Sequence, residues 1–154
     1  MTGDWLDCLF ALLDAGARFL VVGAHAMAVH GVPRGTQDLD VLIDPSPENA
    51  ARVWRALATF GAPLESLRIT IADLQRPGNV IQLGLPPNRI DLLTSISGVE
   101  DFDEAWRDRV EHDIRGRRVP FIGRATLLRN KRASGRAKDR GDIEALGEEE
   151  SESA

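Results

Sequence analysis

Two aspartates separated by one residue, Asp38 and Asp40, are the pair best suited to metal chemistry in this chain. They fall in residues 36–44, where polar and apolar residues alternate and predict a β-strand. Side chains at positions i and i+2 of a strand share one face, about 7 Å apart, so the carboxylates repel each other unless a cation lies between them. Mg²⁺ prefers oxygen ligands and suits such a pair. On spacing alone, the alternative is two exposed strand residues.

Asp91 is the candidate for a third acidic ligand. It stands between apolar residues in a predicted strand over 89–94, and a carboxylate there is costly to bury unless it is paired or coordinated. The alternative is a solvent-facing position on an edge strand. A strand over 18–23 that ends in glycine, followed by a helix of small residues over 24–30, places backbone amides near the first two acids, where a triphosphate could bind.

Positive charge is concentrated in the C-terminal third of the chain. The whole chain carries a formal charge of −5, but residues 107–140 contain twelve Arg or Lys residues and four acids, which gives +8 there and −13 elsewhere. This asymmetry permits a basic face for phosphate on an acidic body, and the alternative is a solvated surface. Lys131 and Lys138 could neutralise phosphate. Asp139 and Asp142 share a helical face and favour structural ion pairs with Arg132 or Arg136, and the alternative is contact with the nucleotide.

The elements that position these residues follow from apolar periodicity and turn signals. Helices are predicted over 4–15, 24–30, 47–60, 102–110, 126–134 and 139–146, and strands over 18–23, 36–44, 79–85 and 89–94. Residues 64–76 are predicted to be a loop with a short helix near 71–74, and 110–122 is either a hairpin or one strand. The length favours one domain over residues 1–146, with an acidic, disordered tail at 147–154.

Composition excludes several classes of protein. The apolar stretches are far shorter than the roughly 20 residues that cross a bilayer, and the N-terminus lacks the order of a signal peptide. The sequence therefore predicts a cytoplasmic protein with no membrane association. The single cysteine, Cys8, has no partner for an intramolecular disulfide and is expected to be a buried apolar residue.

Residues 22–41, VGAHAMAVHGVPRGTQDLDV, resemble the nucleotidyltransferases of the DNA polymerase beta superfamily. They are most similar to the small bacterial group related to the AbiEii-type abortive-infection toxins, whose motif is a small G-G/S pair, then A, H-G, R-x-T and D-x-D. Residues 86–94 and 128–146 add further matches in the same order. The resemblance implies an α+β nucleotidyltransferase fold, with a mixed β-sheet flanked by helices and short C-terminal helices.

The same resemblance implies the roles of the three acids. Asp38, Asp40 and Asp91 would bind two Mg²⁺ ions that orient a nucleoside triphosphate for attack by an acceptor hydroxyl at the α-phosphorus. Asp91 is the candidate general base for that hydroxyl.

The resemblance also implies which residues meet the triphosphate. Gly23 and the amide of Ala24 would face it, and Arg34 and Thr36 would either reach phosphate or brace the turn before the acids. Lys131, which matches a lysine of the group, is favoured for the β- and γ-phosphates.

The leading hypothesis is thus a metal-dependent nucleotidyltransferase that moves a nucleoside monophosphate to a hydroxyl on RNA such as tRNA, on protein or on a small molecule. A role as a toxin–antitoxin component, with a cognate toxin or antitoxin protein as partner, is a further hypothesis. The alternative is a nucleotide-binding protein without catalytic activity. Ala24 allows that alternative, because many active members have serine at this position.

Overall fold

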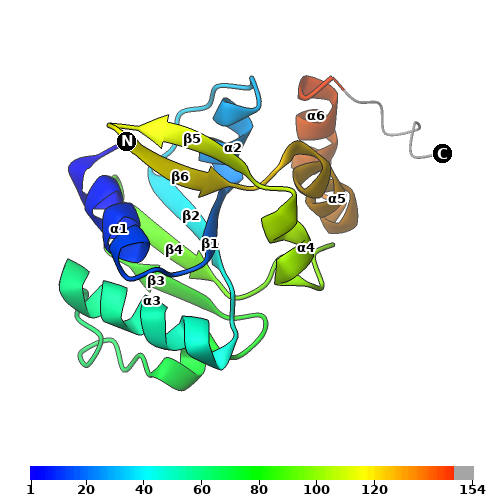
Figure 1. Cartoon of the computed structure of the whole chain (residues 1–154). Coiled ribbons are helices and arrows are strands. Elements are labelled where there is room, and N and C mark those ends of the chain that lie inside the picture. Colours follow the sequence, from blue (N-terminus) through cyan, green and yellow to red (C-terminus); the bar gives the residue numbers. More distant parts are fainter. Residues whose placement is uncertain (148–154) are drawn as a thin grey trace.

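The computed structural model describes residues 1–147 and contains a six-stranded mixed sheet (Figure 1). The predicted tail therefore lies, apart from Gly147, outside the described residues. Along the sheet the strand order is β3-β4-β2-β1-β6-β5. The β1/β6 and β2/β4 pairs are parallel and the other neighbours are antiparallel. The strands are β1 (Phe19–Val22), β2 (Asp38–Ile43), β3 (Val80–Leu83), β4 (Arg89–Leu93), β5 (Val110–Ile114) and β6 (Arg117–Phe121).

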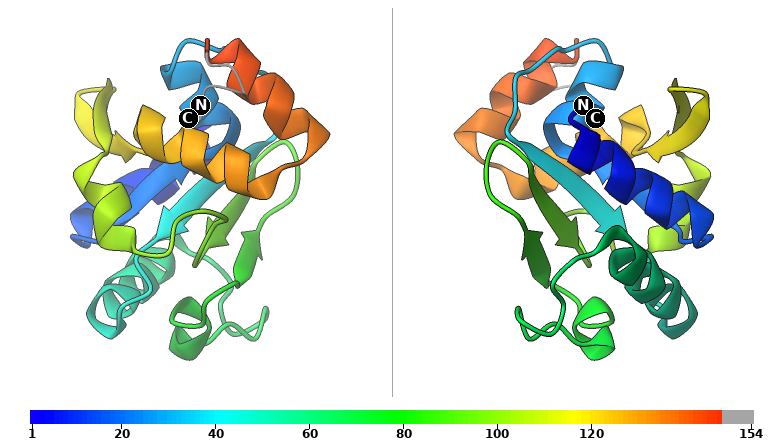
Figure 2. Two further views of the ribbon diagram at one scale, coloured as in Figure 1. Left: turned by 90° about the vertical axis from the view of Figure 1, so that its right-hand side faces the viewer. Right: turned by 90° about the vertical axis from the view of Figure 1, so that its left-hand side faces the viewer.

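Helices flank this sheet on both sides, as the sequence predicts. They are α1 (Gly3–Asp14), α2 (Gly23–Val29), α3 (Pro47–Phe60), α4 (Phe102–Arg107), α5 (Arg124–Ser134) and α6 (Ala137–Ala145), with a short 3₁₀ helix, η1 (Ile71–Leu74). Figure 2 shows α5 and α6 in front of the sheet in one view, and α1 and α3 in front of it in the opposite view. No helix among residues 1–147 is both long enough and apolar enough to cross a bilayer.

Local sequence signals account for the ends of α3. The Ser46 side chain accepts a hydrogen bond from the Asn49 amide at the N-terminus, and Pro47 occupies the first helical position, where a missing N–H costs nothing. Gly61 ends the helix with φ +92°, a left-handed conformation that glycine adopts without strain. The short helix predicted near 71–74 is present as η1.

The core lies between the sheet and its helices. All four residues of β1 are buried, because this strand is central and is covered on both faces. Cys8 is buried in α1, and burial raises the pKa of its thiol to about 12, so it packs as an apolar residue, as predicted.

Residues 110–122 form a hairpin, which resolves the choice that the sequence leaves open. The tight turn lies at Arg115 and Gly116, whose φ angles are +49° and +83°, and the Gly116 amide donates a hydrogen bond to Asp113. Because the chain reverses there, β5 pairs with β6 at one edge of the sheet.

Candidate functional site

The pairing of β2 with β4 brings the three predicted acids together. These strands run parallel, and in their register Asp40 lies opposite Asp91 while Asp38 lies opposite Arg89. Residues opposite each other in a parallel pair share one face, so the three carboxylates lie on the same face of the sheet. Asp91 is 7% exposed and is therefore a buried acid, whereas Asp38 and Asp40 are half-buried.

Burial and neighbouring negative charges both act on the Asp40 carboxyl. Burial raises the pKa of its carboxyl to about 6, with further contributions from the neighbouring charges of Asp91 and Asp38. The positive charges of Arg89 and Lys138 act in the opposite direction but do not cancel the rise. A carboxylate in this position gains from any added cation nearby.

Arg89 is a cation placed among the three acids, although the sequence patterns do not assign it to the site. Its Nε lies 3.1 Å from Asp91 Oδ1 and its Nη2 lies 2.9 Å from Asp91 Oδ2, which makes a bidentate pair. The same Nε is 3.8 Å from Asp38 Oδ1. The position of Arg89 two residues before Asp91 in a predicted strand is the signal that could have found it, since that spacing places both side chains on one face.

The guanidinium of Arg89 changes the metal-binding geometry. Among residues 1–147, no three Asp, Glu, His or Cys side chains are grouped closely enough to hold a metal ion. Asp38, Asp40 and Asp91 share a face, but Arg89 lies between Asp38 and Asp91 and occupies the oxygens that a metal would need. The fold thus assembles the three carboxylates, and two of them, those of Asp91 and Asp38, already pair with a cation of the protein itself.

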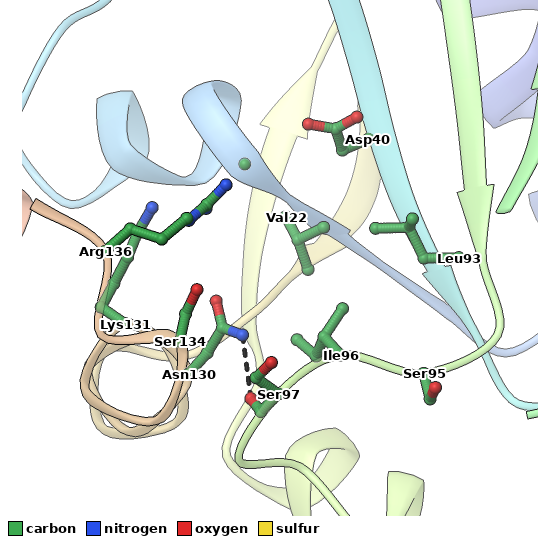
Figure 3. A pocket seen from close by; sticks show the side chains of 11 residues that line it. Val22, Asp40, Leu93, Ser95, Ile96, Ser97, Asn130, Lys131, Ser134 and Arg136 are labelled. Atoms are coloured by element: carbon green, nitrogen blue, oxygen red, sulfur yellow. Dashed lines mark hydrogen bonds between the residues drawn. The ribbon is translucent and has the colours of Figure 1, made fainter. Parts of the chain in front are cut away.

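A pocket of about 420 Å³ opens beside Asp40. Figure 3 shows Asp40 on one side of this pocket and the side chains of Lys131 and Arg136 on the other, with Arg136 extending toward Val22 and Asp40. An Asn130–Ser97 hydrogen bond of 2.9 Å joins α5 to the segment after β4. The pocket is lined by Val22, Gly23, Asp40, Leu93, Ser95, Ile96, Ser97, Asn130, Lys131, Ser134 and Arg136.

The basic wall of this pocket rests on two buried aspartates of α6. Lys131 Nζ lies 2.8 Å from Asp142 Oδ2 and 3.5 Å from Asp139 Oδ1, and Arg136 Nε lies 3.0 Å from Asp139 Oδ2. Arg34 pairs with Asp142 from the loop before β2. Structural pairing of both aspartates is therefore confirmed, with Arg136 as a predicted partner of Asp139 and with Lys131 and Arg34 as partners that were not predicted.

The ion pairs decide the charge state of the two buried aspartates. Asp139 and Asp142 are 0% and 1% exposed. Burial alone would raise the pKa of each carboxyl, but hydrogen bonds from Arg136 to Asp139, and from Lys131 and Arg34 to Asp142, outweigh it and hold both pKa values below the ordinary range. Both groups are therefore ionised at neutral pH, and we call Lys131, Arg34, Arg136, Asp139 and Asp142 the α6 ion-pair network.

The other residues expected to meet the triphosphate lie at different distances from the pocket. Gly23 lines it, and Ala24 follows at the start of α2. Thr36 Oγ1 accepts a hydrogen bond from the Asp38 amide at 3.1 Å, which is the turn-bracing arrangement. Arg34 is directed at Asp142. Arg136, which the sequence suggested only as an ion-pair partner, lies in the pocket wall beside Lys131.

Gly23 allows the close approach of the start of α2 to Asp40. Its φ is +67°, and a Cβ at this position would lie 2.4 Å from Asp40 Oδ2. We expect Gly23→Ala to displace the Asp40 carboxylate and to weaken binding of Mn²⁺ and nucleotide. Gly16→Ala is a matched control, because Gly16 has φ +69° and a Cβ there would meet nothing within 4 Å.

Both glycine substitutions carry the same backbone strain, about 1 kcal/mol for a left-handed residue. Chemical denaturation measures the loss of unfolding free energy that this strain causes in both variants. Calorimetry measures the affinity of each variant for Mn²⁺. Equal binding by the two variants would show that the contact between Gly23 and Asp40 has no part in the site.

No protein-family model matches the chain, and no curated protein matches it. A crystal structure from Thermotoga maritima, described as that of "a putative nucleotidyltransferase", is similar with a TM-score of 0.58 and 16% sequence identity. The similarity covers 94% of this chain and 92% of the Thermotoga chain. At this identity the likeness shows the fold alone. The chain thus has a nucleotidyltransferase-type fold, and the closer resemblance to the AbiEii-type group stays a prediction.

Proposed function

We propose that this protein transfers a nucleoside monophosphate from a nucleoside triphosphate to a hydroxyl group, using divalent cations. The observation that carries the proposal is the pairing of two walls of opposite charge across one pocket. Asp40, with Asp38 and Asp91 beside it, supplies the acidic wall, and Lys131 and Arg136 supply the basic wall. A polyphosphate bound to a divalent cation has the complementary charge pattern. The pocket volume lies within the range of small-molecule sites.

The carboxylates of the acidic wall are the donor type that suits Mg²⁺, although among residues 1–147 no three such groups lie closely enough together to hold an ion as they stand. Carboxylate oxygens are its preferred protein ligands, and the pKa of Asp40 is raised first by burial and then by the negative charges of Asp91 and Asp38, both of which a bound cation would offset. Asp38, Asp40 and Asp91 would hold the ions, provided that the Arg89 guanidinium leaves Asp91. When bound, Mg²⁺ supplies charge neutralisation at the phosphates and lowers the pKa of the acceptor hydroxyl.

The side chains around the pocket would then stabilise the leaving phosphates and accept the proton of the acceptor hydroxyl. Lys131 and Arg136 stabilise negative charge on the β- and γ-phosphates, which become pyrophosphate as the bond from the α-phosphorus to its bridging oxygen breaks. The acceptor oxygen forms the new bond to the α-phosphorus and loses its proton. Asp91 is the carboxylate placed to take that proton, once its oxygens are released by Arg89.

A transfer assay tests the proposal directly. Each of the four nucleoside triphosphates, labelled at the α-phosphate, is incubated with the protein, Mg²⁺ and bulk tRNA, mixed proteins or small-molecule hydroxyl compounds as acceptors. We expect label on one acceptor class, loss of label with a chelator, and equal labelling by Arg118→Gln, a change on β6 where Arg118 pairs with Glu111. Nucleotide binding without transfer to any acceptor would instead favour the catalytically inactive alternative.

Arg136 offers a separate test of the basic wall. Its side chain is 69% exposed, so Arg136→Gln removes a charge from the pocket while Lys131 continues to neutralise Asp139. We expect affinity for a nonhydrolysable ATP analogue to fall on the order of tenfold, the size of a charge-assisted contact with phosphate. Calorimetry measures the affinity, with Arg118→Gln as the matched loss of a surface arginine. Unchanged affinity in Arg136→Gln would remove this residue from the phosphate site.

A further inference from the structure

The bidentate contact between Arg89 and Asp91 stabilises the buried carboxylate but also occupies the oxygens that a divalent ion would bind. Asp91 is buried and must keep a cationic partner, because an unpaired buried carboxylate is costly. The proposed function requires the same two oxygens to face a divalent cation. A guanidinium and a divalent ion on the same carboxylate repel each other, so both partners cannot hold Asp91 fully at the same time.

The neighbouring strand provides a second place for the guanidinium. Gln82 on β3 lies opposite Asp91 in the antiparallel register, so its side chain shares the face of the acids. With its amide oxygen turned toward Arg89, Gln82 accepts hydrogen bonds from Nη1 at 2.9 Å and from Nη2 at 3.0 Å. The guanidinium therefore forms hydrogen bonds with two side chains. One is Asp91, which the proposed function assigns as a metal ligand, and the other is Gln82, which has no role in metal binding.

The main chain of Arg89 is fixed, which leaves the side chain as the part that moves. Its backbone belongs to the β2/β4 ladder, and its carbonyl accepts a hydrogen bond of 3.1 Å from the indole Nε1 of Trp5. The side chain itself is 33% exposed, so the guanidinium has solvent beside it as well as Gln82. Release of Asp91 therefore needs no rearrangement of the sheet.

We propose that Arg89 is an internal counter-cation, which binds Asp91 and Asp38 in the metal-free protein, competes with the divalent ion for them, and keeps only its contact with Gln82 when the ion binds. This inference rests on the proposed function, because it takes the three acids as the metal ligands. It goes further by assigning to Arg89 a positioning role. The arginine keeps the carboxylates of Asp91 and Asp38 paired until the ion arrives, and it lowers the affinity of the empty site for that ion.

Mn²⁺ binding to the nucleotide-free full-length chain tests the competition. Free Mn²⁺ is followed by electron paramagnetic resonance for the wild type, Arg89→Gln, Arg89→Lys, Asp40→Asn and the control Arg118→Gln. We expect Arg89→Gln to bind Mn²⁺ on the order of tenfold more tightly than the wild type, since one competing positive charge is gone. The Mn²⁺ affinity of Arg89→Lys should lie between those of the wild type and Arg89→Gln, because an ammonium group cannot bind both Asp91 carboxylate oxygens in a bidentate contact. Arg118→Gln should match the wild type.

Thermal unfolding provides a readout that does not depend on activity. With a chelator present, Arg89→Gln should melt below the wild type, because Asp91 is left buried without its partner. Saturating Mn²⁺ should raise the melting temperature of Arg89→Gln more than that of the wild type, since the ion replaces the lost cation and binds more tightly. If Arg89→Gln does not fold, the Mn²⁺ affinity of Arg89→Lys tests the competition instead. The proposal then requires Arg89→Lys to bind Mn²⁺ more tightly than the wild type.

The outcomes separate the inference from the proposed function. Mn²⁺ affinity in the Arg89 variants equal to or weaker than that of the wild type, together with loss of binding in Asp40→Asn, would overturn the competition and leave the metal site standing. Equal Mn²⁺ affinity in the wild type and Asp40→Asn would remove the metal site itself, and the inference with it.

Discussion

Asp40→Asn is expected to lower the rate of nucleotidyl transfer on the order of 10³-fold or more, with the protein still folded. Asp40 is the acid in the wall of the pocket and lies between Asp38 on its own strand and Asp91 on the next. Asparagine keeps the shape of the side chain but removes the negative charge that holds a divalent ion. The transfer assay with labelled triphosphate measures the loss, and a reduction of less than tenfold would contradict the assigned role.

The same substitution should make the metal-free protein more stable. Folding raises the pKa of Asp40 from 3.8 to about 6, so the folded state disfavours the ionised form. The resulting penalty is absent below pH 3.8 and grows as the pH rises through about 6. Asparagine carries no such penalty. With allowance for solvent screening at this half-buried group, the gain is about 1 kcal/mol at neutral pH.

Urea unfolding in the presence of a chelator measures this gain. The difference between Asp40→Asn and the wild type should be largest above pH 6 and should vanish below pH 3.8, where Asp40 is protonated in both the folded and the unfolded state. Increased stability combined with lost activity identifies a residue kept for function rather than for folding. A loss of stability at neutral pH would mean that Asp40 serves the fold.

Lys131→Met is expected to cost about 3–5 kcal/mol of unfolding free energy, the usual effect of removing one member of a buried ion pair. Lys131 is 8% exposed, and its ammonium group contacts both buried aspartates of α6. Methionine fills a similar volume, so the loss comes from the charge. Asp139 keeps Arg136 and Asp142 keeps Arg34, but each loses its buried cation.

Arg132→Met is the matched control, because it replaces the next cation along α5, which is exposed. We expect it to change the unfolding free energy by less than about 0.5 kcal/mol. The difference in unfolding free energy between Lys131→Met and Arg132→Met should become smaller as the pH is lowered. The pKa values of Asp139 and Asp142 are lowered in the folded state, so their stabilising contribution exists above their ordinary pKa and is lost as the pH falls. Equal stability of the two variants at neutral pH would contradict a structural role for the α6 ion-pair network.

The sequence predicts the acidic wall better than the basic wall. Alternation within one strand is a local property, so the shared face of Asp38 and Asp40 follows from spacing. The register that sets Asp91 opposite Asp40 joins strands about fifty residues apart, and only the packed sheet determines it. The apolar neighbours of Asp91 make it a candidate third acid, and the family resemblance supports the same choice, but neither determines the register that places it opposite Asp40.

The basic wall depends on which side chains are buried together, and local patterns do not encode that. The helical spacing of Asp139 and Asp142 predicts a common face, but the lysine and the arginines that meet them come from α5, the α5–α6 turn and the loop before β2. Arg89 is a different case. Its two-residue spacing from Asp91 is visible in the sequence, but a guanidinium beside a predicted metal ligand does not fit the expected metal site.

The two walls of the pocket also appear at different times during synthesis of the chain. The three acids lie on β2 and β4 and need only residues up to Leu93, whereas the basic wall needs α5 and α6, the last described helices. Ribosomal synthesis proceeds from the N-terminus, so the acids are made before their opposing charges. During that interval Arg89, made only two residues before Asp91, is the cation at hand for the buried acid. In a nascent chain, Arg89 can therefore neutralise the buried Asp91 carboxylate before the basic wall, and with it the nucleotide pocket, has been synthesised.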